Sequence, residues 1–350
     1  GSIGSEIVRQ VMSFDPACVL LCDQAESALH EFQLEMEEKF GKHKIKTFLG
    51  NIQSHERMSL LFDQYSPQIV FHAAAYKHVP MMEHHPAEAV LTNVAGTKNL
   101  ADMAILHYVE KFVMISTDKA VNPTNVMGTS KRIAEKYVQS LSNFQDTDKS
   151  FKTKFVTTRF GNVLGSNGSV IPRFYKQIQS GGPVTVTDPE ITRFFMTIPE
   201  AVLLVLEACT MGHGGEIFVF DMGQAVKIVD LAKKMIRLTG LIPDRDIKIQ
   251  FTGLRPGEKL YEEVLSESEK TIPTYHDKIR IAKVSETSYF DTLRDVLDLI
   301  ASCDNKDPLQ LVKKMKQMIP EFLSKNSRFE LLDAVTEKDI VTRLIPAEAV

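Results

Sequence analysis

Short apolar runs alternate with longer segments of mixed polar and apolar residues through the first half of the chain. The runs have the length of buried strands, whereas the mixed segments repeat their apolar residues at helical spacing. This alternation predicts an α/β fold with a Rossmann-type, doubly wound parallel sheet. Strands are expected at residues 17–22, 44–49, 69–72, 111–115 and 155–160, and helices at residues 26–40, 56–65, 87–108 and from residue 126 onward.

The alternation breaks down after about residue 165, where turns rich in Gly and Pro separate shorter elements. We expect a first domain at residues 1–165, with return segments near 190–225. A second, smaller α/β domain is expected at 166–189 and 226–350, including a C-terminal helical extension. The helices predicted after residue 165 are 172–179, 200–209 and 227–238, and the strands are 184–186, 217–220 and 248–251; of these, 200–209 and 217–220 fall in the return segments.

Composition narrows the class of protein. The 350 residues are 43% hydrophobic and 25% charged, enough for two buried cores. A net charge of -4 offers no basic field for nucleic acid. No apolar run approaches the roughly 20 residues that span a bilayer, so no membrane contact by this chain itself is expected. Four cysteines without a Cys-x-x-Cys pair favour reduced thiols in the cytoplasm and no metal site: Cys18, Cys22, Cys209 and Cys303.

The first residues resemble the second half of a glycine-rich phosphate loop that runs into a helix. Gly1, Ser2, Ile3 and Gly4 would let the backbone approach a pyrophosphate at the helix N-terminus. A dinucleotide fold needs a strand before these glycines, so its first strand is expected to be missing from this sequence. The alternative is a Gly-Ser remnant of an expression tag.

Further positions fit a dinucleotide. Asp23 ends a predicted strand about 20 residues after the glycines, where an acid binds the adenosine ribose; this favours NAD over NADP. Small residues after the strand at 69–72 would let a cofactor lie against the backbone. The remaining expected cofactor contacts are Asn51 and Ile52 at the adenine, Ala73, Ala74 and Ala75 at the strand end, Asn93 on the next helix, and Ser116 and Lys131 further along the chain.

The predicted strand at 111–115 ends in four polar residues, Ser116 to Lys119. Ligands of open α/β sheets bind at the carboxyl ends of the strands, so this cluster is expected to face a substrate. The following helix places Met127 and Lys131 on one face, one turn apart. The alternative for Lys131 is a surface pair with Glu135, and for Met127 it is plain core packing.

A histidine-rich stretch follows the alanines, with His78, Glu83, His84 and His85. Their spacing matches no known zinc arrangement, and a solvated loop before a helix is the better interpretation. Lys77, beside this stretch, is a candidate for the pyrophosphate or the sugar. A solvated lysine is the alternative.

Several residues suit a diphosphate or sugar. A glycine-containing loop follows the predicted strand at 155–160, and a rigid Gly/Pro loop spans residues 253–259. Arginines on such loops bind phosphate oxygens, although each could instead form an exposed salt bridge. The predicted substrate contacts are Lys77, Arg159, Asn162, Arg173, Arg193, Arg255 and Glu258.

Six segments together resemble the UDP-N-acetylglucosamine 4,6-dehydratases of capsule, flagellar and glycan biosynthesis, in the extended short-chain dehydrogenase/reductase superfamily. The resemblance runs from residue 1 to about residue 282 and includes GSIGSE, FHAAAYKHVPMME, ISTDKAVNP, TRFGNVLGSNGSVIP, TRFFMTIPEA and GLRPGEKLYEE.

The resemblance implies NAD as cofactor and UDP-N-acetylglucosamine or a similar UDP-sugar as substrate, bound by the first and second domains respectively. C4 is oxidised, water is eliminated across C5 and C6, and hydride returns to C6. Thr117 would bind the C4 oxygen, Asp118 would be the acid, and Lys119 would be the base. A base role requires a depressed pKa for Lys119. Lys131 would orient the nicotinamide ribose.

One departure concerns the superfamily's Tyr-x-x-x-Lys, which is here Met127 to Lys131. The base for the C4 hydroxyl is therefore open among Asp118, a bound water and Lys131. The same substitution marks a long subgroup that is anchored in the membrane. This similarity implies a homo-oligomer at the cytoplasmic face of the inner membrane, through an N-terminal region absent from this sequence.

Two other functions compete with dehydration. A UDP-sugar 4-epimerase shares the fold and the C4 oxidation but needs no acid and base at C5 and C6, so Asp118 and Lys119 favour dehydration. A catalytically inactive NAD-binding module is the other alternative. The preferred C2 substituent stays open.

Overall fold

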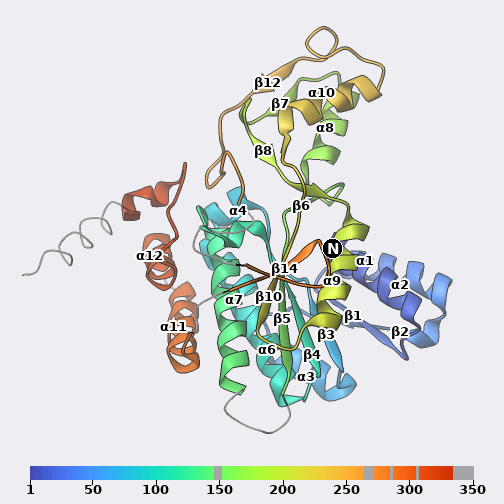
Figure 1. Cartoon of the computed structure of the whole chain (residues 1–350), viewed down its shortest axis with the longest axis vertical. Coiled ribbons are helices and arrows are strands. Elements are labelled where there is room, and N and C mark those ends of the chain that lie inside the picture. Colours follow the sequence, from blue (N-terminus) through green and yellow to red (C-terminus); the bar gives the residue numbers. More distant parts are fainter. Residues whose placement is uncertain (146–151, 264–270, 284–286, 305–306, 334–350) are drawn as a thin grey trace, which may run out of the picture.

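The computed structural model describes residues 1–145, 152–263, 271–283, 287–304 and 307–333. A large body is built around a sheet, and a smaller body that contains α8, α10, β7, β8 and β12 stands above it (Figure 1). The two are joined near β6, so the upper edge of the large sheet faces the smaller body.

The large sheet has six strands in the order β13-β14-β10-β5-β4-β3. Its four parallel strands are β3 (Ile69–His72), β4 (Lys111–Ile115), β5 (Lys154–Arg159) and β10 (Glu216–Phe220). Two antiparallel strands, β14 (Ile279–Ala282) and β13 (Thr271–Pro273), complete one edge. The parallel core confirms the predicted Rossmann-type α/β fold.

β4 shows why this sheet is buried on both faces. Phe112 and Met114 point into one apolar cluster, and Val113 and Ile115 point into another. Successive side chains of a strand alternate between faces, so a continuous apolar run serves two cores. The register pairs Ile115 with Thr158, so β4 and β5 end side by side.

Helices cover the two faces of this sheet. α3 (His55–Tyr65), α6 (Gly96–Leu106) and α7 (Val126–Gln145) pack on one face, and α1 (Ser2–Val11) and α9 (Ile198–Met211) pack on the other. The hydroxyl of Ser54 accepts a hydrogen bond from the Arg57 amide and caps α3. The helix predicted at 87–108 is α5 (Pro86–Ala89), a π-helical segment (Val90–Ala95) and α6 in succession.

The two strands that precede β3 in the sequence form a separate sheet. β1 (Val19–Asp23) and β2 (Ile45–Leu49) pair in parallel, with α2 (Glu26–Phe40) packed beside them. Within the described residues neither strand pairs with β3.

The stretch predicted as a solvated loop contains the helix α4 (Val79–His84). Pro80 at its first turn suits a helix start. The prediction is also wrong for Glu83, which is 4% exposed. Its carboxylate accepts hydrogen bonds from the Val126 amide and the Ser327 hydroxyl, and these contacts keep the segment against the protein.

The smaller body has its own apolar core, which includes Phe174, Ile178, Val184 and Ile236. It is built from α8 (Val170–Gln179), β7 (Val184–Val186), β8 (Thr192–Arg193), β11 (Val226–Lys227), α10 (Ile228–Leu238) and β12 (Ile249–Phe251). β6 (Asn162–Val163) and β9 (Phe195–Met196) pair where the chain enters and leaves this body.

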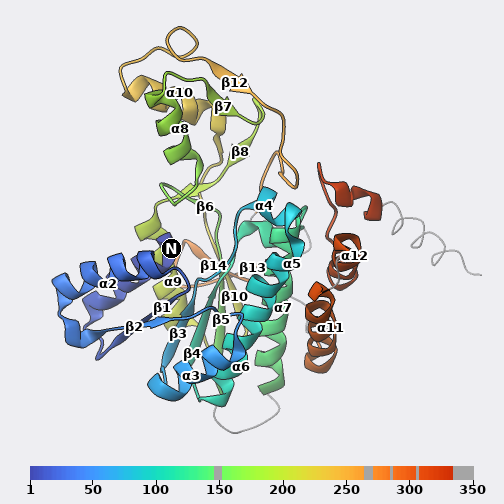
Figure 2. The same cartoon turned by 180° about the vertical axis from the view of Figure 1, so that it is seen from behind.

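The C-terminal part returns to the large body, contrary to the predicted boundary at residue 226. β13 and β14 join the six-stranded sheet. α11 (Tyr289–Ala301) and α12 (Pro308–Met318) lie beside α7 in both views (Figures 1 and 2). Val296, Leu299 and Val312 are buried in the same apolar cluster as Phe112. No helix in the described ranges is both long and apolar enough to cross a membrane.

Candidate active site

The loops that follow β3, β4 and β5 meet at the carboxyl edge of the large sheet. The Asp118 amide donates to the Phe160 carbonyl at 3.1 Å, which ties the loop after β4 to the loop after β5. Lys77 Nζ donates to the Asn167 carbonyl at 3.0 Å, which ties in the loop after β3. This edge faces the smaller body, as expected of a ligand site in an open α/β sheet.

Thr117, Asp118 and Lys119 form one hydrogen-bonded cluster at this edge. Asp118 Oδ1 accepts from Thr117 Oγ1 at 2.8 Å and from Lys119 Nζ at 3.0 Å. Lys119 Nζ also donates to Asn162 Oδ1 at 3.2 Å, so the predicted Asn162 is part of the cluster. Asp118 is 0% exposed, and its Oδ2 has no hydrogen-bond partner in the part of the chain that the structure describes.

Two glycines allow this packing. A side chain on Gly128 would overlap the carbonyl oxygen of Lys119, so glycine lets α7 approach the catalytic loop. A Cβ on Gly161 would lie 3.1 Å from Asp118 Oδ2 and crowd the unpartnered oxygen.

Glu262, which the sequence analysis did not single out, is the other carboxylate beside Lys119. Its Oε1 lies 3.5 Å from Lys119 Nζ and 3.6 Å from Arg193 Nε. Burial lowers the pKa of Lys119, but the charges of Asp118 and Glu262 outweigh it, and the net pKa is raised. The predicted depression of this pKa is therefore wrong. Residue 262 is far from residue 119 in sequence, so no local pattern indicates the contact.

Lys131 is a second buried amine on the first turns of α7. It is 4% exposed, and its ammonium has no hydrogen-bond acceptor among the described residues. Burial lowers its pKa to about 8, against the opposing charge of Glu135. The predicted alternative of a surface pair is wrong because both side chains are buried. Met127, one turn earlier, is 3% exposed within the apolar cluster, as its core-packing alternative expects.

Two predicted site residues belong instead to a buried ion pair behind the site. Arg159 donates from Nε to Glu135 Oε1 at 2.8 Å and from Nη2 to Oε2 at 2.6 Å, and both residues are 0% exposed. The Ser116 hydroxyl also donates to Glu135, at 2.6 Å. Burial raises the pKa of Glu135, but Arg159 outweighs it and the net value falls to about 2. The structure thus commits the Arg159 guanidinium and the Ser116 hydroxyl to the buried Glu135 carboxylate.

Asn93 is also a structural residue. It is 0% exposed, and its amide both donates to and accepts from the backbone of Tyr76, at 3.0 and 2.8 Å. Its nitrogen donates to the Ser130 hydroxyl as well. Asn93 therefore fixes the loop after β3 to α7, and the predicted direct contact with a cofactor is wrong.

The start of α1 and the end of β1 fit one end of a dinucleotide. The space where side chains would stand on Gly1 and Gly4 is open, and Asp23 Oδ2 lies 3.8 Å from the Gly1 nitrogen. Ser2 Oγ accepts from the Asn167 amide, which brings the loop after β6 to the same place. An open helix N-terminus beside a carboxylate suits a pyrophosphate and a ribose.

The other predicted cofactor positions differ in exposure. Ala73 and Ala75 are half-buried and Ala74 is exposed, as a surface for a flat ligand requires. Asn51 is half-buried, and its side chain accepts from the Gln53 amide. Two side chains pack into apolar clusters, so they can offer only their backbone to a cofactor: Ile3 and Ile52.

The predicted diphosphate residues separate into two groups. Arg193 Nη2 and Arg255 Nη2 both donate to Glu258 Oε1, at 3.3 and 3.2 Å, and Arg255 is exposed. Arg193 is 8% exposed and also donates to the Lys259 carbonyl. Arg173 lies apart on α8, where it donates to Thr185. The structure thus gathers Arg193, Arg255 and Glu258 next to Glu262, and leaves Arg173 outside this group.

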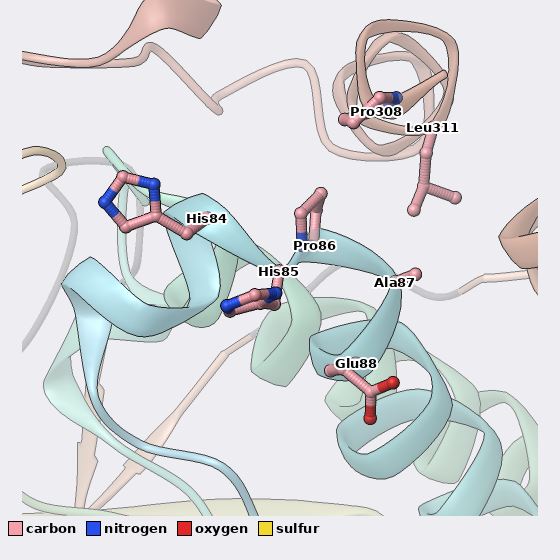
Figure 3. A pocket seen from close by; sticks show the side chains of 7 residues that line it. All are labelled: His84, His85, Pro86, Ala87, Glu88, Pro308 and Leu311. Atoms are coloured by element: carbon pink, nitrogen blue, oxygen red, sulfur yellow. The ribbon is translucent and has the colours of Figure 1, made fainter. Parts of the chain in front are cut away.

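A cavity of about 220 Å³ lies away from this site, between the α4–α5 junction and the start of α12 (Figure 3). His84, His85 and Glu88 line one side, and Pro308 and Leu311 line the other. Across the described ranges, no three His, Cys, Asp or Glu side chains are placed to hold a metal ion.

The fold and the site define a Rossmann-type protein of the extended short-chain dehydrogenase/reductase class. The chain belongs to the family described as polysaccharide biosynthesis protein, which matches residues 1–284.

Relatives within this family are close. The capsular polysaccharide biosynthesis protein CapD of Staphylococcus aureus is 50% identical over 317 residues, which cover 90% of this chain and 52% of CapD. The probable polysaccharide biosynthesis protein EpsC of Bacillus subtilis (strain 168) is 50% identical over 299 residues, or 85% of this chain and 49% of EpsC. The chain thus spans about half the length of these relatives. A UDP-glucose 4-epimerase of Rickettsia bellii is 37% identical over 269 residues, or 77% of this chain and 76% of that protein.

Solved structures share the architecture. Pen from Bacillus thuringiensis superposes with a TM-score of 0.72 at 35% identity, covering 83% of this chain and 86% of Pen. A dTDP-glucose 4,6-dehydratase, DesIV of Streptomyces venezuelae, with NAD bound, has a TM-score of 0.65 at 20% identity, covering 76% of this chain and 85% of DesIV. The DesIV likeness shows the fold alone.

Proposed function

We propose that this chain catalyses the NAD-dependent 4,6-dehydration of UDP-N-acetylglucosamine, or a similar UDP-sugar, to the 6-deoxy-4-keto product in polysaccharide biosynthesis. The observation that carries the proposal is the Asp118–Lys119 pair, an acid and a base 3.0 Å apart at the end of β4. Elimination across C5 and C6 needs both functions at once.

The raised pKa of Lys119 keeps its amine protonated in the resting site, where it donates a hydrogen bond to Asp118. A proton passed from Lys119 to Asp118 along their hydrogen bond yields a neutral amine and a carboxylic acid. A neutral pair is favoured when a substrate excludes water, because buried charges are costly. The amine then removes the C5 proton, the acid protonates the C6 hydroxyl that leaves as water, and the pair returns to its ionic form.

Other residues of the edge have supporting roles. Thr117 holds the C4 oxygen, and Lys131, with a pKa of about 8, is the candidate base for the C4 proton. Bound NAD supplies the hydride acceptor for C4 and the hydride donor for C6. The start of α1 and Asp23 would hold its adenosine diphosphate end. Met127, packed in the apolar cluster, excludes water.

The nucleotide diphosphate of the substrate would lie against Arg193 and Arg255. In the structure these arginines face Glu258, which a diphosphate would displace as their anionic partner. Arg255 is the better candidate because it is exposed, whereas Arg193 is nearly buried.

A second candidate function is UDP-sugar 4-epimerisation, favoured by the 37% identity to a protein named UDP-glucose 4-epimerase. That reaction leaves C5 and C6 unchanged, so it has no use for the Asp118–Lys119 pair. Incubation with NAD and UDP-N-acetylglucosamine separates the two reactions by product mass. Dehydration predicts loss of one water, and an isomer of unchanged mass would establish the epimerase.

A further inference from the structure

The residues that follow α12 contact two loops that carry candidate site residues. We call residues 319–333 the C-terminal segment; they lie beyond residues 1–284, which the family matches. Two aromatic side chains anchor the segment in the apolar cluster that includes Phe112: Phe322 and Phe329 are at most 1% exposed. Lys316 of α12 donates to the Phe322 carbonyl at 3.1 Å and to Ser324 Oγ at 2.8 Å, and forms an ion pair with Asp333.

One edge of the C-terminal segment pairs with the catalytic loop, residues 118–126. The Leu323 amide donates to the Pro123 carbonyl and the Lys325 amide donates to the Thr124 carbonyl, each at 3.2 Å. Two backbone hydrogen bonds therefore hold the C-terminal segment against the catalytic loop.

The other side of the same segment holds the substrate loop, residues 253–263. The Gly257 amide donates to the Lys325 carbonyl at 2.8 Å, and the Gly257 carbonyl accepts from Asn125 Nδ2 at 3.0 Å. Gly257 has a φ of +76°, and a Cβ there would lie 2.6 Å from Asn125 Cβ, so only glycine allows this approach. The peptide of Lys325 therefore bridges the two loops.

Ser327 extends the bridge to the start of α7. Its hydroxyl donates to one oxygen of the buried Glu83 carboxylate, and the other oxygen accepts from the Val126 amide at 2.8 Å. Val126 begins the helix that carries Lys131. Ser327 also caps the short helix Arg328–Leu332, where Phe329 is anchored.

We infer that the C-terminal segment positions the substrate loop against the catalytic loop, with Ser327 as a positioning residue for binding the nucleoside diphosphate. The inference rests on the proposed function, which assigns the diphosphate to Arg255 and Arg193. NAD binding should not depend on the segment, because α1 and β1 lie on the opposite side of the large body from α12 (Figures 1 and 2).

The test compares three variants of the full chain. Ser327→Ala removes the hydroxyl, and Ser327→Thr keeps it at a backbone position whose extended φ of -130° suits a β-branched residue. Ser302→Ala is the matched control. It removes a half-buried serine hydroxyl that is likewise hydrogen-bonded to a charged side chain, Lys314, but at the end of α11. Hydrogen exchange of residues 253–263, calorimetric binding of UDP and of NAD, and Tm are measured for each.

Ser327→Ala should speed exchange in residues 253–263 and weaken UDP binding about fivefold to tenfold, the effect of one lost hydrogen bond. NAD affinity should be unchanged, and Ser327→Thr should behave as the wild type. Unchanged exchange in Ser327→Ala, or an equal loss of UDP and NAD affinity, would overturn the inference.

These outcomes are separable from the proposed function. If the chain fails to dehydrate the UDP-sugar but Ser327→Ala alters exchange and UDP affinity, only the proposed reaction fails. If dehydration occurs while Ser327→Ala matches Ser302→Ala in every measurement, only the positioning role fails.

Discussion

Lys119 Nζ lies 3.0 Å from Asp118 Oδ1 and 3.5 Å from Glu262 Oε1, so one amine stands between two carboxylates. Both charges raise the pKa of Lys119. Because the neutral pair forms by proton transfer within the Asp118–Lys119 pair, losing the Lys119 proton to solvent inactivates it, so Glu262→Gln should lower this pKa and move the alkaline limb of the kcat/KM profile to lower pH by roughly one unit.

The control for this shift is Glu263→Gln. Glu263 is the next residue of the same loop and accepts a hydrogen bond from Asn122, away from Lys119. Its pH profile should match the wild type. Identical profiles for the two variants would remove Glu262 from the electrostatics of the base.

The buried Lys131 makes stability depend on pH. Folding lowers its pKa from 10.5 to about 8. Between these values the unfolded chain holds a proton that the folded chain lacks, so the free energy of unfolding rises with pH across this window. Below this pH window Lys131 is protonated in both states, and burying its ammonium lowers the free energy of unfolding by the full amount.

Lys131→Met should therefore be more stable than the wild type near neutral pH, by up to about 3 kcal/mol, and this gain should shrink as the pH rises toward about 10. Urea unfolding at several pH values measures it. Lys234→Met on the exposed face of α10 is the control and should give a constant difference. A gain that does not change with pH would mean that Lys131 is not desolvated.

Removing one partner of the buried Arg159–Glu135 ion pair should strongly lower the free energy of unfolding. Arg159→Met leaves a buried carboxylate without its bidentate partner and should lower the free energy of unfolding by about 3–5 kcal/mol. Arg294→Met removes an exposed arginine that pairs with Asp291 and Asp295, and should cost under about 1 kcal/mol. Denaturant unfolding compares the two, and equal losses would contradict the burial argument.

Met127 stands where the superfamily has its tyrosine, so a substitution there shows whether its thioether takes part in the reaction. Met127→Leu keeps the volume of a residue that is 3% exposed, so turnover should stay within roughly tenfold of the wild type. A loss as large as that of Lys119→Met would place the thioether in the chemistry.

Patterns within a few neighbouring residues predict many of the helices and strands. The strand at 111–115 and the helix at 56–65 agree with the structure, because an apolar run and helical spacing are properties of a few neighbouring residues. The same locality explains why Thr117, Asp118 and Lys119 could be found together: they are adjacent in the chain.

Contacts between distant segments could not be predicted in this way. The sequence predicts a substrate contact for Arg159 because it shows the charge of this residue. It does not show that Arg159 forms a buried ion pair with Glu135. Glu83 seemed solvated because its partners, Val126 and Ser327, come from other parts of the chain. Glu262 was missed for the same reason.

In the proposed elimination, Lys119 removes the C5 proton and Asp118 protonates the leaving C6 hydroxyl. Lys119→Met deletes the base, so turnover should fall by about 10²- to 10⁴-fold while NAD and the UDP-sugar still bind. C4 oxidation depends on Thr117 and Lys131 and should survive in part. Asp118→Asn keeps the amine but removes its proton acceptor, so C5 exchange should appear only when the pH is high enough to deprotonate Lys119, while water loss at C6 stalls at every pH.

The most direct test is a single turnover of both variants with UDP-N-acetylglucosamine and NAD in deuterated water, following NADH absorbance and deuterium at C5 by NMR. We expect NADH without C5 deuterium in Lys119→Met and, at a pH that deprotonates Lys119, C5 deuterium in unreleased 4-keto sugar in Asp118→Asn. Loss of both signals in both variants would contradict the division of roles. Normal turnover of Lys119→Met would place the base elsewhere, with Lys77 as the next candidate.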